Sequence, residues 1–183
     1  LFYVIMFLNG VLNISLGPCL NAIIHDFNLT TARGSLFPTA YYVGNLLGIL
    51  ATGFFIKGHW LKKCLSFSVA ISAVALVLVS ISRSWYLALL FVIANGIALG
   101  FLYAYLAAIL SKIQLPQQLS QSLNYLYGSF GVGMILGPII AQLILSWSGN
   151  WRFLFFVEGI AMAGSLLLIL VLPLPTRSEE RRV

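Results

Sequence analysis

The sequence is poor in charged side chains. Only 8% of its 183 residues are Asp, Glu, Lys or Arg, whereas an average soluble domain has about 25%. So few charges cannot cover the surface of a soluble globular protein. A disordered chain is also excluded, because 61% of the residues are hydrophobic. The net charge of +6 arises from a scarcity of acidic residues rather than from a basic cluster, so we expect no nucleic-acid partner.

Residue types that carry chemistry are equally scarce. Two cysteines, Cys19 and Cys64, are too few for a disulfide framework, and we expect two free thiols. The two histidines, His25 and His59, have no neighbours at metal-ligand spacing. The sequence also contains no phosphate-binding glycine loop, CxxC pair or Ser-His-Asp set. We therefore expect neither an enzyme nor a bound metal or cofactor.

What the sequence does contain is a series of long apolar runs. A helix needs about 20 apolar residues to cross a bilayer, and the continuity of the runs argues against the alternating strands of a β-barrel. Polar breaks separate six predicted spans, at residues 1–24, 33–56, 61–82, 85–111, 117–146 and 151–172. The sequence thus predicts an all-α membrane protein. Residues 1–183 form a single six-helix transmembrane domain, with residues 173–183 as a short charged tail.

The basic residues are distributed unequally between the two sides of these spans. One side holds Lys57, Lys62, Lys63, Lys112, Arg177, Arg181 and Arg182. The other side holds Arg33, Arg83 and Arg152. Because basic loops stay in the cytoplasm, we predict cytoplasmic termini and a multi-pass protein of the plasma (inner) membrane. Trp85, Trp147 and Trp151 then lie at the outer interface, where aromatic belts occur.

Small residues indicate where the spans touch. Three GxxxG pairs predict close helix contacts: Gly44 and Gly48, Gly96 and Gly100, and Gly133 and Gly137. Pro138, directly after the third pair, removes a backbone hydrogen bond and predicts a kink. Gly17-Pro18 predicts a similar irregularity in the first span. Such helices could open and close a cavity mouth, although Gly-Pro is also common in membrane helices without that role.

Three segments of the sequence resemble those of one known family, the major facilitator superfamily. They are Gly133 and Gly137 with Pro138 in the fifth span, the loop from Gly53 through Lys57-Gly58 to Lys62-Lys63, and Asn150-Trp151-Arg152-Phe153 at the start of the sixth span. They are similar to the family's fifth-helix motif, its loop between the second and third helices, and the start of its sixth helix. Asn124, followed by Gly131-Val-Gly133, is similar to the fucose-permease-like branch.

The resemblance implies the N-terminal six-helix half of a twelve-helix transporter. Such a half consists of two inverted three-helix repeats, and the solute is held near the midplane. Its partner is a second six-helix half, supplied by a C-terminal domain, a second copy or a separate subunit. The sequence departs from the family at Lys57, where the family has an Asp that helps to gate the cytoplasmic side. This departure puts the gating role of the loop that starts at Gly53 in doubt.

Polar side chains inside membrane spans are costly and mark pathways. The candidate solute-binding residues are Asn9, Asn13, Asn95, Tyr103, Asn124 and Tyr125. Asn9 and Asn13 are four residues apart and share a helix face. Amides both donate and accept hydrogen bonds, which suits hydroxyl-bearing solutes. We predict that the four asparagines line one water-accessible cleft. The alternative is that these amides hydrogen-bond between helices and stabilise the bundle.

Glu158 is the acidic residue that falls inside a predicted span, about two turns into the sixth. One hypothesis makes it a partner of Arg152 or a polar group in helix packing. The other makes it a protonatable group in ion coupling. Because the centres of the first, fourth and fifth spans lack an acid, we do not expect this half to carry proton coupling alone.

Two functions fit these observations. In the first, the chain is one half of a secondary active or facilitative transporter that moves a small solute across the lipid bilayer by alternating access. In the second, it is an accessory or scaffold subunit that keeps the fold without transporting. The polar residues of the spans favour transport, and the altered loop at Lys57 favours the scaffold.

Overall fold

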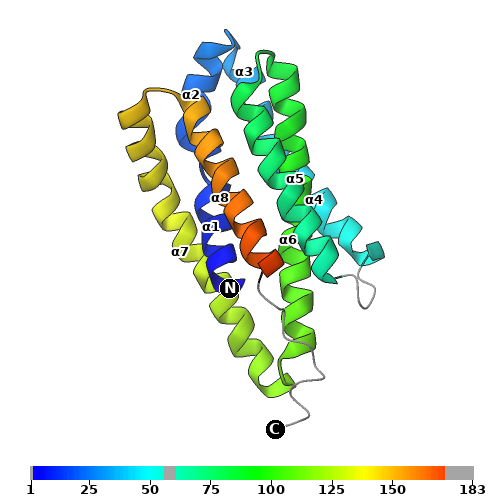
Figure 1. The fold of residues 1–183 in the computed structure, drawn as a ribbon. Coiled ribbons are helices and arrows are strands. Elements are labelled where there is room, and N and C mark those ends of the chain that lie inside the picture. Colours follow the sequence, from blue (N-terminus) through cyan, green and yellow to red (C-terminus); the bar gives the residue numbers. More distant parts are fainter. Residues whose placement is uncertain (1, 56–60, 172–183) are drawn as a thin grey trace.

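The computed structural model describes residues 2–55 and 61–171, and every regular element within them is an α-helix. The elements are α1 (Phe2–Asn13), α2 (Leu16–Asp26), α3 (Thr31–Gly34), α4 (Leu36–Phe55), α5 (Leu61–Ile81), α6 (Trp85–Ile113), α7 (Pro116–Ser148) and α8 (Trp151–Val171). The long helices run up and down in one elongated bundle (Figure 1). The all-α prediction is confirmed for this part of the chain. Lys57 and the predicted tail lie outside the described residues.

Five helical segments of the described chain are long and apolar enough to cross a membrane. They are Phe2–Asp26, Lys62–Ile81, Trp85–Ile113, Pro116–Ser148 and Trp151–Val171. The span predicted at residues 33–56 overlaps the end of the four-residue α3 and includes the 20-residue α4. α4 is long enough to cross, but Pro38, Tyr41, Tyr42 and Asn45 make it less apolar than the others. Five of the six predicted spans thus coincide with helical segments that are long and apolar enough to cross a membrane.

The first membrane segment is interrupted between α1 and α2. α1 ends at Asn13, and α2 begins two residues beyond Ile14. Pro18 explains this position, because proline has no N–H to donate to the Ile14 carbonyl and its ring crowds that carbonyl. The N–H of Gly17 donates to the Ile14 carbonyl instead, at 3.1 Å. The irregularity predicted from Gly17-Pro18 therefore lies just before that pair.

Short polar residues and a glycine mark the helix starts and ends at the end of the bundle where α2 meets α3. The Thr30 side chain accepts a hydrogen bond from the Arg33 N–H at 3.3 Å, so Thr30 caps α3. The Asn150 side chain accepts from the Arg152 N–H at 2.9 Å, at the start of α8. Gly149 has a φ of +64°, which favours glycine, and it ends α7. All of these turns lie at the upper end of the bundle in Figure 1.

Glycines occupy the closest helix contacts. α4 lies against α6, and α1 lies against α7, while α5 packs on both α6 and α8. A Cβ on Gly48 or Gly100 would clash with backbone atoms across the α4–α6 contact. A Cβ on Gly133 would clash with the backbone of α1. The absence of side chains thus allows the backbones to approach, as in other membrane bundles.

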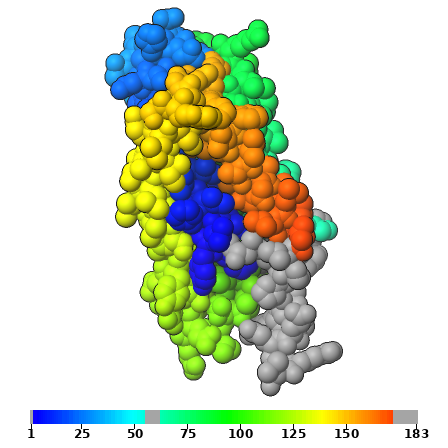
Figure 2. All heavy atoms as spheres, turned by 60° about the vertical axis from the view of Figure 1, so that its left-hand side comes forward, coloured from blue at the N-terminus to red at the C-terminus, as the bar shows by residue number. Residues whose placement is uncertain are grey.

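α1 lies between α7 and α8 when the molecule is viewed from one side. Figure 2 shows α1 in blue, flanked by α7 in yellow and green and by α8 in orange. A cavity of about 180 Å³ lies among these helices, and Ser15 at the α1–α2 interruption also lines it. On the outside of the bundle, α4 and α7 expose large apolar side chains, among them Leu46, Leu50, Ile135 and Leu143. Such faces are typical of surfaces covered by lipid or by other helices.

Candidate functional site

Asn13 joins three helices through hydrogen bonds. Its side-chain amide donates to the Tyr41 hydroxyl at 2.8 Å and to the Tyr103 hydroxyl at 3.1 Å. Asn13 is the last residue of α1, Tyr41 lies on α4 and Tyr103 on α6. Asn13 and Tyr41 are buried and Tyr103 is half-buried. We call these three residues the Asn13 cluster.

The Asn13 cluster offers both donors and acceptors to a polar solute. The amide nitrogen uses its two N–H groups on the two phenols, which leaves the amide oxygen as an acceptor. The two phenols are also hydrogen-bonded to each other, so one phenol hydrogen remains to be donated. The Tyr103 ring also packs edge-on against Phe130 of α7, with the ring centroids 5.3 Å apart. The cluster thus places hydroxyl and amide groups beside an aromatic wall.

Sequence analysis found two members of the cluster and missed Tyr41. Tyr41 lies three residues before Gly44 and seven before Gly48, so all three share one helix face. Because that face meets α6, a tyrosine on it was bound to approach α6. The GxxxG spacing was therefore the signal that pointed to Tyr41.

Asn95 and Asn9 make other contacts. The Ser72 hydroxyl of α5 donates to the Asn95 side-chain oxygen of α6 at 2.6 Å, and both side chains are buried. The Asn9 amide donates to the Ile5 carbonyl within α1 at 2.8 Å. The Asn9 side-chain oxygen is buried and has no hydrogen-bond partner among the described residues. Asn95 thus links two helices, as the alternative interpretation of these amides expects.

Asn124 and Tyr125 lie on an exposed face of α7. The Gln121 side chain donates to the Tyr125 hydroxyl at 3.0 Å. Tyr125 also meets Tyr3 of α1 edge-on, with the ring centroids 6.4 Å apart. Asn124 is exposed, whereas Asn9 and Asn95 are buried. The structure therefore brings Asn13 together with Tyr103, but the four asparagines do not form one hydrogen-bonded cluster.

Glu158 is buried in α8, and none of the described residues forms an ion pair with it. It is only 4% exposed, and neither carboxylate oxygen has a hydrogen-bond partner among the described residues. The predicted pairing with Arg152 is wrong, because Arg152 forms its ion pair with Asp26 at 2.8 Å. Helix geometry explains the error: residues six apart do not share a face. Glu158 instead lines the 180 Å³ cavity together with Ser15.

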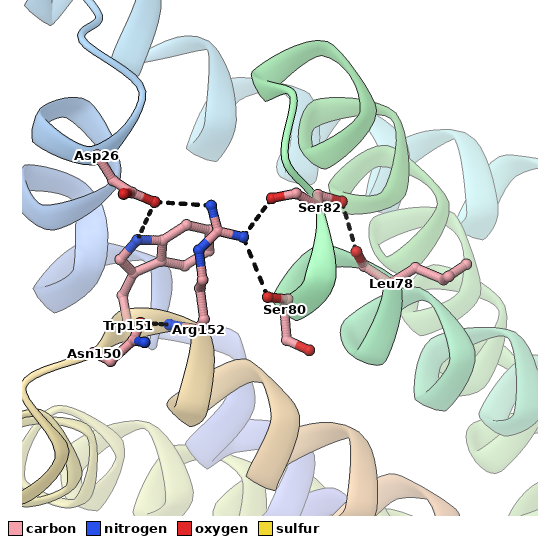
Figure 3. Close-up of polar contacts among 7 residues, drawn as sticks. All are labelled: Asp26, Leu78, Ser80, Ser82, Asn150, Trp151 and Arg152. Carbon is pink, nitrogen blue, oxygen red and sulfur yellow. Dashed lines mark hydrogen bonds and ion pairs between the residues drawn. The ribbon is translucent and has the colours of Figure 1, made fainter.

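Arg152 is the centre of a polar cluster at the upper end of the bundle (Figure 3). Besides its ion pair with Asp26, the guanidinium donates to the carbonyl oxygens of Ser80 and Ser82 at the end of α5. The Trp151 indole N–H donates to the same Asp26 carboxylate oxygen at 3.2 Å. We call Asp26, Trp151 and Arg152 the Arg152 clamp. It ties the end of α2 to the start of α8 and to the end of α5.

The clamp was not foreseen as a unit. Trp151 is buried and Trp147 is exposed, and both lie at the end of the bundle where α7 is followed by α8. The guanidinium carbon of Arg152 lies 4.6 Å from the Trp151 ring centroid and 5.3 Å from that of Phe27, within range of cation–π attraction. Asp26 and Arg152 are opposite charges on the same predicted side of the membrane, and that was the available signal.

The residues proposed for gating and packing lie in different surroundings. A Cβ on Gly137 would lie 2.5 Å from Ile14 Cγ2 and 2.7 Å from the Val11 carbonyl oxygen, so Gly137 lies tightly against α1. Pro138 lies inside α7, which continues as one helix to Ser148. Gly53 is exposed, and a Cβ there would meet nothing within 4 Å. Of the glycines proposed for gating and packing, Gly133 and Gly137 belong to a helix contact among the described residues, and Gly53 does not.

Comparison with known proteins gives consistent results. Residues 2–183 match the family profile described as "Major Facilitator Superfamily". The chain is 24% identical over 162 residues to an "Uncharacterized MFS-type transporter YfiU" of Bacillus subtilis (strain 168). That alignment covers 86% of the chain and 30% of the relative. The chain therefore spans about a third of the length of this relative.

Proposed function

The chain belongs to the major facilitator superfamily and is an integral, multi-pass membrane protein, and on this premise we propose that it is one six-helix half of a solute transporter. In this proposal, α3 and α4 together cross the membrane as the sixth span. The half moves a small polar solute by alternating access, and the Asn13 cluster is the core of the binding site. A second six-helix half completes the transporter.

The pairing of helices supports two inverted three-helix repeats. Counting α1–α2 as the first span and α8 as the sixth, close contacts join the first span to the fifth, the second to the fourth, and the third to the sixth; a further close contact, of the third span with the fourth, has only a slight counterpart between the first span and the sixth. An exchange of spans 1–3 with spans 4–6 converts the first of these contacts into the second and leaves the third unchanged. Such an exchange is what inverted repeats produce.

The observation that carries the binding proposal is the meeting of α1, α4 and α6 at the Asn13 cluster. In a repeat arrangement, α1 and α6 are equivalent helices, and the midplane site lies between them. The cluster supplies the amide of Asn13 from α1 and the phenol of Tyr103 from α6. A solute with hydroxyl groups would exchange hydrogen bonds with these groups at little net cost.

The exposed faces of α4 and α7 supply the surface for a second half. Both present large apolar side chains outward, and α7 adds the polar pair of Asn124 and Tyr125. In our proposal these two residues face the solute pathway from the rim. The second half is a C-terminal domain, a second copy or a separate subunit. The relative is about three times as long as the matched region, which leaves room for a second half within one polypeptide.

The charge distribution supports an orientation with both ends of the domain in the cytoplasm. In that orientation the Arg152 clamp lies on the outer side, and Lys62, Lys63 and Lys112 lie on the cytoplasmic side of the plasma (inner) membrane. Cysteine labelling tests it. A cysteine at Ser84 should react with an impermeant maleimide from outside intact cells, and one at Lys112 should not. The opposite result would invert the domain.

Glu158 remains a candidate for ion coupling in this proposal. A buried carboxylate without a hydrogen-bond partner is costly in its charged form. Its position beside Ser15 at the interruption of the first span places it where a change in the helix would alter its surroundings. Glu158→Gln should therefore change the ion dependence of uptake while leaving the bundle folded.

Uptake into liposomes that contain the purified protein tests the function. A panel of radiolabelled sugars, polyols and amino acids serves as the probe. For the solute that is taken up, Asn13→Leu should reduce uptake by about tenfold or more, because the acceptor oxygen is lost and Tyr41 and Tyr103 lose the amide that holds them in place. Gln142→Leu removes an exposed amide of α7 and is the matched control, with uptake unchanged. A folded protein that takes up no member of the panel would favour the scaffold function instead.

A further inference from the structure

A long apolar groove runs along the outside of α5 and α6, away from the Asn13 cluster. It consists of two adjoining depressions of about 400 and 420 Å³. The depressions share Phe67 and Ile71, so they form one continuous groove. It extends from Lys63 to Leu78 on α5, and we call it the α5–α6 groove.

The length and lining of the groove suit one lipid acyl chain. Fifteen residues of α5 separate its ends, which corresponds to about 22 Å of helix. This exceeds one leaflet of the hydrocarbon core, which is about 15 Å deep. Phe67, Ile71, Val74 and Leu78 follow each other at helical spacing and form an apolar stripe. An acyl chain that lies against this stripe is in contact with protein over its full length.

One end of the groove carries a positive charge. Of the described residues that line it, Lys63 alone is charged, and it lies in the first turn of α5. Lys62 precedes it at the same helix end but does not line the groove. A lysine ammonium binds phosphate as a point charge. Basic residues at the mouth of a groove between membrane helices are a recognised setting for acidic lipid headgroups.

We propose that the α5–α6 groove binds an anionic glycerophospholipid, with one acyl chain along the stripe and the phosphate on Lys63. The site is separate from solute binding, because Asn13 and Tyr41 lie on other helices and Tyr103 and Tyr105 project from nearly opposite sides of α6. Binding in this groove differs from general contact with bilayer lipid in two respects. It has a headgroup preference, and that preference depends on one named lysine.

Quenching of tryptophan fluorescence by brominated acyl chains tests the proposal. The reporter is Phe67→Trp in the full protein in mixed micelles, with the fluorescence of the parent subtracted. Brominated phosphatidylglycerol should quench the reporter at about fivefold lower mole fraction than brominated phosphatidylcholine, as expected for one lysine near an anionic lipid. A reporter at Leu167→Trp, on the outside of α8, should be quenched equally by both lipids.

Two lysine variants separate the groove from general electrostatics. Lys63→Gln in the Phe67→Trp protein should abolish the preference for phosphatidylglycerol. Lys112→Gln removes a charge at the end of α6 and should keep it. Phosphatidylglycerol should also slow the reaction of Cys64, which lines the groove, with maleimide. Equal quenching by both lipids, or a preference that survives Lys63→Gln in a protein that elutes like the parent, would overturn the proposal. An equal loss of the phosphatidylglycerol preference in Lys112→Gln would also overturn it.

Discussion

The two glycine-lined contacts, α4 with α6 and α1 with α7, differ in how freely they can adjust. In the α4–α6 contact both helices are continuous, and Cβ atoms on the facing glycines would meet backbone. In the α1–α7 contact, Cβ atoms on Gly10 and Gly133 would also meet backbone, but α1 ends at Asn13, and a Cβ on Gly137 would meet the Ile14 side chain as well as the backbone. The first contact is therefore fixed by backbone against backbone. The second ends, at Gly137, beside the interruption between α1 and α2, where we expect it to adjust more easily.

The largest expected effect is at the fixed contact. Gly100→Ala places a methyl group against the Asn45 carbonyl, with the N–H of Ile49 at 2.9 Å and the Cα of Gly48 at 3.0 Å. Because none of these atoms belongs to a flexible side chain, α4 and α6 must separate. We expect a loss of more than about 3 kcal/mol in the free energy of unfolding. Thermal unfolding in detergent measures it, and a parental melting temperature would contradict the comparison.

At the adjustable contact the same change should cost less. Gly137→Ala meets Ile14 Cγ2 at 2.5 Å, and the Ile14 side chain can turn away next to the interruption. The Val11 carbonyl oxygen at 2.7 Å still resists. We expect a loss of about 2 kcal/mol, and Gly137→Leu should disrupt the bundle. Gly128→Ala is the matched control on α7, because a Cβ there meets nothing within 4 Å. If Gly137→Ala were as damaging as Gly100→Ala, the two contacts would be equally rigid.

The difference between the contacts marks the limit of prediction from the sequence. Run length and the GxxxG spacing predict the helices and the faces on which Gly100 and Gly137 lie, because both depend on local geometry. The pairing of Asp26 with Arg152 depends on two helix ends 126 residues apart. Its prediction requires knowing which helices are neighbours, and no local pattern contains that information.

The candidate site shows the same limit. Asn9, Asn13 and Asn95 are identifiable because amides are rare and costly in apolar helices. Which of them bonds to another helix depends on the rotation of each helix about its axis. Asn95 turns toward Ser72, and Asn13 turns toward Tyr41 and Tyr103. Apolar residues surround each span on all sides, so hydropathy does not fix that rotation.

The Arg152 clamp bears on the α1–α7 contact, because it anchors the end of α2, which follows α1 across the interruption. Arg152→Gln removes the ion pair to Asp26 and the charged hydrogen bonds to the carbonyls of Ser80 and Ser82. We expect a loss of about 1–2 kcal/mol, since the pair is partly exposed to solvent. Hydrogen exchange should rise in α2 and stay unchanged in α4. Asp26→Asn should cost below about 1 kcal/mol, because its amide oxygen still accepts from Trp151. Equal exchange in α2 and α4 would show that the clamp does not hold α2.

The smallest effect on stability should come from the residue that makes the two contacts different. Pro18→Ala restores an N–H that can donate to the Ile14 carbonyl and removes the ring that crowds it. The added hydrogen bond and the greater freedom of the unfolded chain oppose each other, so stability should change by less than about 1 kcal/mol. The interruption should close into a continuous helix, and the amides of Ser15 and Gly17 should exchange more slowly. Uptake should fall even though the Asn13 side chain is intact, if movement at the interruption accompanies transport.

Gly17→Ala is the matched control, because a Cβ at Gly17 meets nothing within 4 Å and Pro18 remains. Unchanged exchange at Ser15 and Gly17 in Pro18→Ala would mean that the packing of α1 against α7 imposes the interruption, and the adjustable contact would then be as fixed as the one between α4 and α6.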